Sequence, residues 1–149
     1  MTKREKDWWI IMVDDNTITK TVEKFFERDV QRDLMLIHSA TSVSSPSFDG
    51  MPKGTSDGNG SENKMMAYSD AKTTINMIHS AFDLMDQDEA DVLNILYLKG
   101  WTATKAAMTL CVATRSVYRL RKKALLDFAF AYRAGELIDR VTNNATATV

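Results

Sequence analysis

A block of basic side chains marks the part of this sequence with the clearest chemistry. Between Val92 and Leu126 the chain has no Asp or Glu, although it carries −1 overall. An acid-free basic segment is typical of a surface that meets phosphates, whereas a merely solvated helix face usually mixes both signs. The segment therefore indicates nucleic-acid binding. Its basic residues are Lys99, Lys105, Arg115, Arg119, Arg121, Lys122 and Lys123.

The spacing of small and apolar residues within this block predicts two helices joined by a tight turn. The first helix is expected from about Thr102 to Leu110, and the second from Thr114 onward. The small Ala107 would let the second helix cross closely, and Val112 would anchor the turn. This order is that of a helix-turn-helix motif. Its inner face would consist of Ala106, Ala107, Leu110, Val117, Leu120 and Ala124.

The first exposed residues of the second helix are the predicted readers of DNA sequence. We expect Arg115, Ser116 and Arg119 to contact base edges, because a recognition helix reads with its N-terminal residues and arginine can bond guanine with two hydrogen bonds. Neighbouring residues would reach phosphates and sugars. These predicted backbone contacts are Thr102, Thr104, Lys105, Thr114, Tyr118, Arg121, Lys122 and Lys123.

The turn departs from the motif at one position. Cys111 stands where a glycine is usual, because the backbone there commonly has a positive φ. A non-glycine residue in that conformation costs roughly 1 kcal/mol, which a packed motif can absorb. We expect Cys111 to be a small buried side chain rather than a reactive thiol.

Patterns of catalytic or ligand-binding residues are weak. His38 and His79 have no partners at metal-ligand spacing, and the acidic residues from Asp86 to Asp91 fit a helix start. The glycine-rich stretch from Ser45 to Met65 has the residue order of neither a phosphate-binding loop nor a calcium loop. We therefore expect no catalytic residue, metal site or cofactor, and no enzymatic activity.

The elements that would hold the basic block are predicted to be helices throughout, so the fold class is all-α. Apolar residues at helical spacing begin at Ile18 and continue to Leu34, and they recur between Met65 and Leu98. The helix from Thr114 is expected to reach about Ala134. Four parts follow from these patterns: an N-terminal helical segment (1–40), a Gly/Pro/Ser-rich linker (41–62), a C-terminal helix-turn-helix domain (63–137) and a disordered tail (138–149).

The single cysteine and the short apolar runs indicate the cellular compartment of the protein. One cysteine excludes an internal disulfide framework, and the apolar run Trp8 to Val13 is too short to span a membrane. This run could form a short strand, a helical turn or a partner-binding patch, and packing against the protein's own core is the favoured interpretation. We predict a cytoplasmic protein without a membrane partner.

Three stretches of the sequence resemble a known family. They are DDNTITKTVEKFF (14–26), SPSFDGMPKGTSDGNGSENKM (45–65) and SVYRLRKKALLDFA (116–129). Together they resemble the ArpU family of regulators from phages and prophages of Gram-positive bacteria, whose helix-turn-helix is similar to the fourth region of sigma factors. The resemblance implies a transcriptional activator of late packaging, structural and lysis genes. Such a regulator would act with host RNA polymerase in the bacterial cytoplasm.

Two other functions fit the same residues. A small DNA-recognition subunit of a phage packaging terminase also uses a helix-turn-helix, and a protein-interaction adaptor could direct a basic helix at an acidic partner. If the DNA target is palindromic, a homodimer is expected. The aromatic residues Phe128, Phe130 and Tyr132 could then form the dimer interface, or they could belong to the core.

Overall fold

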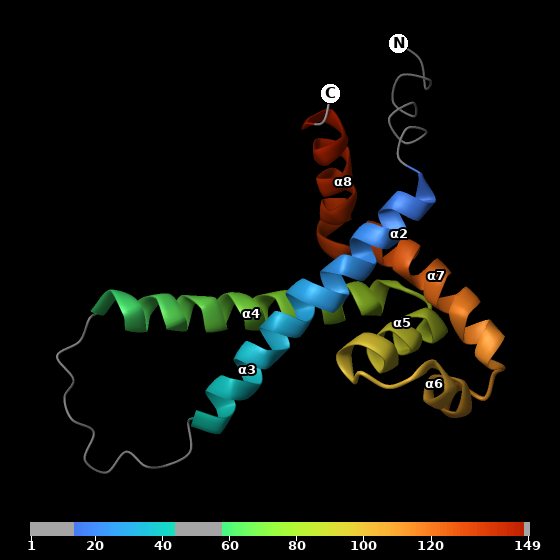
Figure 1. Ribbon diagram of the computed structural model, residues 1–149, viewed down its shortest axis with the longest axis horizontal. Coiled ribbons are helices and arrows are strands. Elements are labelled where there is room, and N and C mark those ends of the chain that lie inside the picture. Colours follow the sequence, from blue (N-terminus) through green and yellow to red (C-terminus); the bar gives the residue numbers. More distant parts are fainter. Residues whose placement is uncertain (1–13, 44–57, 148–149) are drawn as a thin grey trace.

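The computed structural model describes residues 14–43 and 58–147, and its secondary structure in these ranges is helical (Figure 1). The all-α prediction is confirmed for this part of the chain. The apolar run from Trp8 to Val13 and residues 44–57 of the predicted linker lie outside the described residues.

The first described element is a continuous helical rod. It consists of α2 (Asp15–Lys24), a π-helical segment η1 (Phe25–Val30) and α3 (Gln31–Val43). Below, this whole element is called the N-terminal rod. Its first turn follows Asp14, whose backbone is extended. The predicted amphipathic helix is confirmed, since Ile18, Val22 and Val30 are among its buried residues.

One glutamine joins two π-helical segments. The second such segment, η2 (Asn94–Leu98), directly continues α5 (Gln87–Leu93). Gln31 Nε2 donates hydrogen bonds to the carbonyl oxygens of Phe26, at 3.2 Å, and Tyr97, at 2.7 Å. Phe26 lies in η1 and Tyr97 in η2, so this side chain connects the rod to the helix that comes directly before Lys99, the first basic residue of the block.

The longest helix, α4 (Gly58–Leu84), packs against α3 and extends away from the other helices (Figure 1). Both helices reach into the predicted linker, because α3 continues to Val43 and α4 begins at Gly58. Helix therefore occupies both ends of the segment 41–62.

The C-terminal region contains α6 (Ala103–Leu110), α7 (Thr114–Ala131), a 3₁₀ turn η3 (Tyr132–Gly135) and α8 (Glu136–Ala147). The predicted end of α7 near Ala134 is three residues too late. Arg133, Ala134 and Gly135 all have positive φ, which ends α7 and reverses the chain so that α8 packs against α2.

The prediction of a disordered tail from residue 138 is wrong for residues 138–147. These residues belong to α8, in which Leu137, Ile138 and Val141 form a buried apolar stripe. Arg140 adds a tertiary contact, since its Nη1 lies 3.6 Å from Asp29 Oδ2 on the N-terminal rod. Packing on other helices stabilises a segment that is too short and too polar to be a strong helix by itself.

An aromatic cluster connects the N-terminal rod to α4 and to the end of α7. The ring of Phe128 on α7 lies 4.6 Å from that of Phe26, 5.2 Å from Tyr132 and 5.9 Å from Phe82. Phe128 and Tyr132 are buried, so these two aromatics belong to the core, whereas Phe130 is exposed. The predicted N-terminal segment and helix-turn-helix region thus share one hydrophobic core.

Candidate nucleic-acid interface

Hydrogen bonds at both ends of α6 define this helix and the short turn that leads to α7. Thr102 caps α6, since its Oγ1 accepts a hydrogen bond from Lys105 N at 3.2 Å. The helix ends at Cys111, which has the left-handed conformation expected for that position (φ 56°, ψ 42°). Val112 N then donates to the Ala107 carbonyl at 3.0 Å, a bond typical of helix C-termini. α7 starts immediately afterwards.

Two expectations about side chains in this turn are wrong. The Val112 side chain is 40% exposed, so the turn is anchored by the Val112 backbone N–H rather than by apolar burial. Cys111 is also exposed. Both follow from the left-handed residue, which turns the chain outward before α7 begins.

The contact between the two helices is close because the inner face is made of small residues. Ala106, Ala107, Val117 and Ala124 are buried, as predicted, and Leu110 and Leu120 are half-buried. Burial of these residues fixes the rotation of α7 about its axis. The opposite face of its first turns therefore points to solvent.

The three predicted base-contacting residues lie on that outer face. Arg115, Ser116 and Arg119 are all exposed, and Arg115, Arg119 and Lys122 follow one another at intervals of four and three residues. Such residues form a stripe along one side of a helix. Among the described residues, none of the ion pairs involves a member of this stripe. We call Arg115, Arg119 and Lys122 the cationic stripe.

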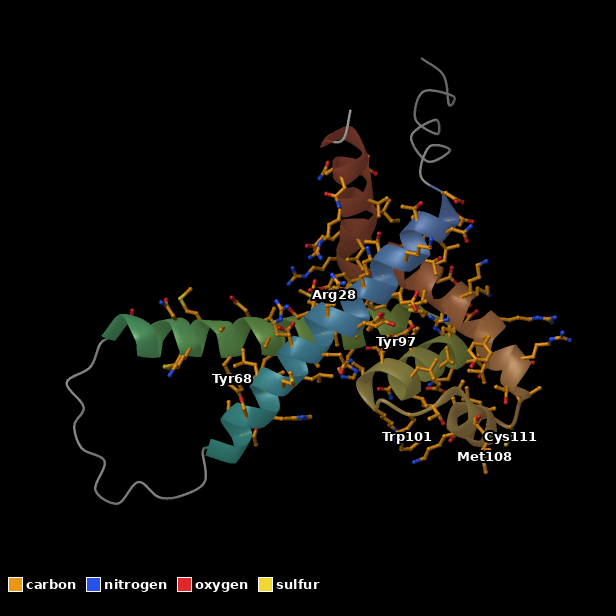
Figure 2. The ribbon with its side chains drawn as sticks, in the orientation of Figure 1. Arg28, Tyr68, Tyr97, Trp101, Met108 and Cys111 are labelled. Atoms are coloured by element: carbon orange, nitrogen blue, oxygen red, sulfur yellow. The ribbon has the colours of Figure 1, made fainter. Side chains whose placement is uncertain are left out.

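Most of the predicted phosphate contacts are exposed as well. Tyr118 on α7 is 56% exposed. Trp101, which the sequence analysis did not single out, holds two cations around the start of α6: its ring centroid lies 3.8 Å from Lys105 Nζ and 4.7 Å from Lys99 Nζ. Figure 2 shows Trp101, Met108 and Cys111 at the edge of the molecule formed by α6. The exposed members of the predicted set are Thr102, Thr104, Lys105, Thr114, Tyr118 and Lys122, together with Lys123.

Arg121 is placed differently from the prediction. Its Nε donates to Tyr97 Oη at 2.9 Å, its Nη2 pairs with Glu23 on the N-terminal rod, and its side chain is only 26% exposed. Burial raises the pKa of the Tyr97 phenol, which therefore stays neutral and accepts this bond. Arg121 thus connects α7 to α2 and η2. To contact a phosphate, its side chain would have to break its bonds to Tyr97 and Glu23.

Lys123 also has acidic partners within the chain. Its Nζ lies 2.8 Å from Glu89 Oε1 and 3.9 Å from Asp86 Oδ2, although the side chain is 63% exposed. Two nearby carboxylates offset its charge, which weakens any attraction to a phosphate. The sequence could not reveal this pairing because Glu89 lies outside the acid-free block.

An acidic helix start lies beside the cationic stripe. A groove of about 550 Å³ separates Asp14 and Asp15, at the beginning of α2, from Arg119 and Lys122. The groove is also lined by Asn16, Thr19, Lys123 and Leu126. These two carboxylates reduce the positive potential near Lys122 more than near Arg115, which lies about two turns away along α7. The start of α7 therefore keeps more of its positive potential than the part of the stripe near Lys122.

Searches of known families, curated proteins and solved structures find no match to this chain. The resemblance to the ArpU family thus gains no support from these comparisons. No helix in the described ranges is both long and apolar enough to cross a lipid bilayer. Within the same residues, no three His, Cys, Asp or Glu side chains converge in a way that could hold a metal ion.

Proposed function

We propose that the chain is a sequence-specific regulator of transcription that binds double-stranded DNA, with α6, the turn at Cys111 and α7 acting as a helix-turn-helix similar to that of sigma region four. In this arrangement α7 enters the major groove with its N-terminal end. Arg115, Ser116 and Arg119 contact bases. Thr102, Thr104, Lys105, Thr114, Tyr118 and Lys122 contact the sugar-phosphate backbone.

One observation carries the proposal: the cations of α7 fall into two groups. Arg121 and Lys123 pair with acidic residues of the chain, whereas the cationic stripe points to solvent without such partners among the described residues. Packing fixes the rotation of α7, so the positions of its exposed residues are fixed too. Cations that only kept the protein soluble could lie at any exposed position and would not need to line up at the start of this helix. Alignment there is what a major-groove contact requires.

The resemblance to the ArpU family adds a more specific role to this proposal. In that role the protein activates packaging, structural and lysis genes late in phage infection, together with host RNA polymerase. A reconstituted transcription reaction tests this part, with a site selected by the protein from random duplexes placed upstream of a promoter. Increased transcript is expected. Assembly of the protein into rings in sedimentation experiments would favour the terminase function instead.

DNA binding itself is tested by fluorescence anisotropy with a labelled duplex at several salt concentrations between about 50 and 200 mM. We expect log Kd to rise with log salt, by about 0.9 for each neutralised phosphate. Arg115→Ala should weaken binding, and the matched control Arg28→Ala, on the N-terminal rod away from α6 (Figure 2), should not. Both changes remove one exposed positive charge.

Two results would contradict the proposal. Absence of salt-dependent duplex binding would leave the protein-interaction adaptor as the better function. Equal weakening by Arg115→Ala and Arg28→Ala would show that only net charge matters, and would remove α7 as the recognition helix.

A further inference from the structure

Two lysines of the basic block meet on one aromatic ring. The Nζ atoms of Lys105 and Lys99 lie 3.8 Å and 4.7 Å from the centroid of the Trp101 ring. The two ammonium groups are therefore closer to each other than the Debye length of about 10 Å in 0.1 M salt, so they repel each other. We call Lys99, Trp101 and Lys105 the tryptophan cluster.

The backbone on either side of Gly100 fixes this cluster. Lys99 N donates a hydrogen bond to the Asn94 carbonyl at 2.9 Å, where η2 ends. Trp101 N donates to the Ile95 carbonyl at 3.0 Å. Gly100 has a φ of 70°, a conformation that favours glycine. The Trp101 side chain is half-buried and packs against the core, so its ring is a fixed support for the two exposed lysines.

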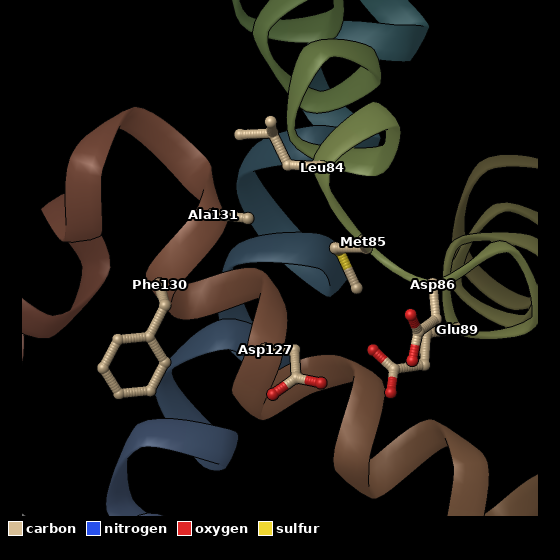
Figure 3. A pocket seen from close by; sticks show the side chains of 7 residues that line it. All are labelled: Leu84, Met85, Asp86, Glu89, Asp127, Phe130 and Ala131. Carbon is tan, nitrogen blue, oxygen red and sulfur yellow. The ribbon is translucent and has the colours of Figure 1, made fainter.

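The lysines of the tryptophan cluster lack the acidic partners that other cations of the block have. Neither takes part in an ion pair among the described residues. Lys123, in contrast, lies 2.8 Å from Glu89 and 3.9 Å from Asp86. Figure 3 shows these two carboxylates near that of Asp127, beside α7. Two like charges held together without a counter-charge repel each other, and a bound anion would offset this repulsion.

The geometry of the cluster suits a phosphate better than a nucleobase. The Lys105 ammonium group lies over the indole ring at 3.8 Å, so that face of the ring is closed to a stacking base. The two ammonium groups offer positive charge and several N–H donors, which phosphate oxygens accept. Thr102 and Thr104 are exposed at the start of α6, and their hydroxyl groups can add further donors.

We infer that the tryptophan cluster is a phosphate clamp, in which Trp101 holds Lys99 and Lys105 against the sugar-phosphate backbone of the duplex that α7 reads. The inference rests on the proposed function. It adds Lys99 as a phosphate contact and Trp101 as a positioning residue. α6 has eight residues and is about 12 Å long, so the clamp lies about that far from the start of α7. A second contact at this distance fixes the orientation of α7 on the duplex.

The first test compares two lysines that each lie over an aromatic ring. Anisotropy titrations with one random duplex give the slope of log Kd against log salt. Lys99→Ala should reduce this slope by about 0.9, because one phosphate contact is lost. The matched control is Lys72→Ala on α4, since Lys72 is exposed and its Nζ lies 5.4 Å from the centroid of the Tyr68 ring. This control should keep the wild-type slope, and equal slopes in the two variants would overturn the inference.

A double-mutant cycle tests the positioning role of Trp101. Trp101→Leu keeps an apolar side chain but removes the aromatic ring, and should weaken duplex binding by about threefold to tenfold. In that background Lys99→Ala should weaken binding less than it does in the wild type, because Lys99 is no longer held over a ring. Trp101→Phe retains a ring and should keep most of the affinity. Additive effects of Trp101→Leu and Lys99→Ala would overturn the clamp.

Two further measurements distinguish other ligands. Inorganic phosphate should displace the duplex no more than chloride does at equal ionic strength, and stronger displacement that Lys99→Ala removes would assign the cluster to a small phosphate. Trp101→Leu should weaken duplex more than single-stranded DNA, and the reverse order would show that the ring stacks on bases. Either of these contrary results overturns the inference. Circular dichroism checks the fold of each variant, and Lys99→Ala still tests the clamp if Trp101→Leu unfolds the protein.

The same titrations separate failure of the clamp from failure of the proposed function. If Arg115→Ala weakens duplex binding while Lys99→Ala and Trp101→Leu bind like the wild type, the clamp alone is overturned. If the wild type shows no salt-dependent duplex binding, the proposed function is overturned and the clamp with it.

Discussion

The two halves of α7 differ in the side chains that they carry and in where those side chains lie. The first half exposes the cationic stripe to solvent, and the second half buries Leu125, Phe128 and Ala129 in the core. Arg121 and Lys123, near the middle, are held by acidic residues of other helices. The order of charges along the sequence therefore does not show which cations are available to a ligand. Their availability depends on the acidic residues that lie near each cation in the folded protein.

The largest expected effect comes from the buried half. Phe128 is fully buried at the centre of the aromatic cluster, whereas Phe130, two residues later, is 56% exposed. Phe128→Ala should lower the free energy of unfolding by about 3–5 kcal/mol, because it removes a large buried side chain and leaves a cavity. Phe130→Ala should change it by less than about 0.5 kcal/mol. Urea denaturation followed by circular dichroism measures both values.

Similar losses for the two phenylalanines would contradict the packing of α7 described above. The comparison also tests the dimer interpretation of these aromatics. If Phe130 forms an interface between two copies, Phe130→Ala should lower stability more at high protein concentration than at low concentration.

The next comparison concerns two arginines of α7, one expected to contribute to stability and the other to DNA binding. Arg121→Ala should lower the free energy of unfolding by about 1.5 kcal/mol, because it removes charge-assisted hydrogen bonds to Tyr97 and Glu23. Its effect on duplex affinity should be small below the unfolding temperature. Arg119→Ala should leave stability nearly unchanged and lower affinity for a selected site by about 1–3 kcal/mol. Urea denaturation and anisotropy titration provide the two measurements.

A loss of duplex affinity in folded Arg121→Ala as large as that in Arg119→Ala would show that Arg121 leaves its partners and reaches the DNA. An equal loss of affinity for random and selected duplexes in Arg119→Ala would move Arg119 from the base contacts to the phosphate contacts.

Much of the helical architecture could be predicted from local patterns. The periodic apolar residues from Ile18 to Leu34 predicted the N-terminal rod, and the residues around Ala107 and Val117 predicted the contact of α6 and α7. These patterns are local, since residues three and four apart share one face of a helix. A short element such as α8 lacks enough of this signal, because its stability depends on contacts with α2.

The parts of the candidate site that escaped prediction depend on long-range contacts. Arg121 meets Glu23, which is 98 residues away in sequence, and Asp14 lies across a groove from Arg119. No spacing within the basic block contains this information. The same reason explains why Lys123 was expected to contact phosphate, although Glu89 and Asp86 lie beside it.

The smallest expected effect is a difference in the salt dependence of DNA binding between variants of two adjacent lysines. Lys122 belongs to the cationic stripe, whereas Lys123 pairs with Glu89 and Asp86. Lys122→Ala should reduce the slope of log Kd against log salt by about 0.9, because one phosphate contact is lost. Lys123→Ala should leave this slope nearly unchanged, since its charge is already offset within the protein. Anisotropy titrations of both variants against one random duplex measure the difference. Equal slopes in the two variants would mean that Lys123 exchanges its carboxylate partners for phosphate.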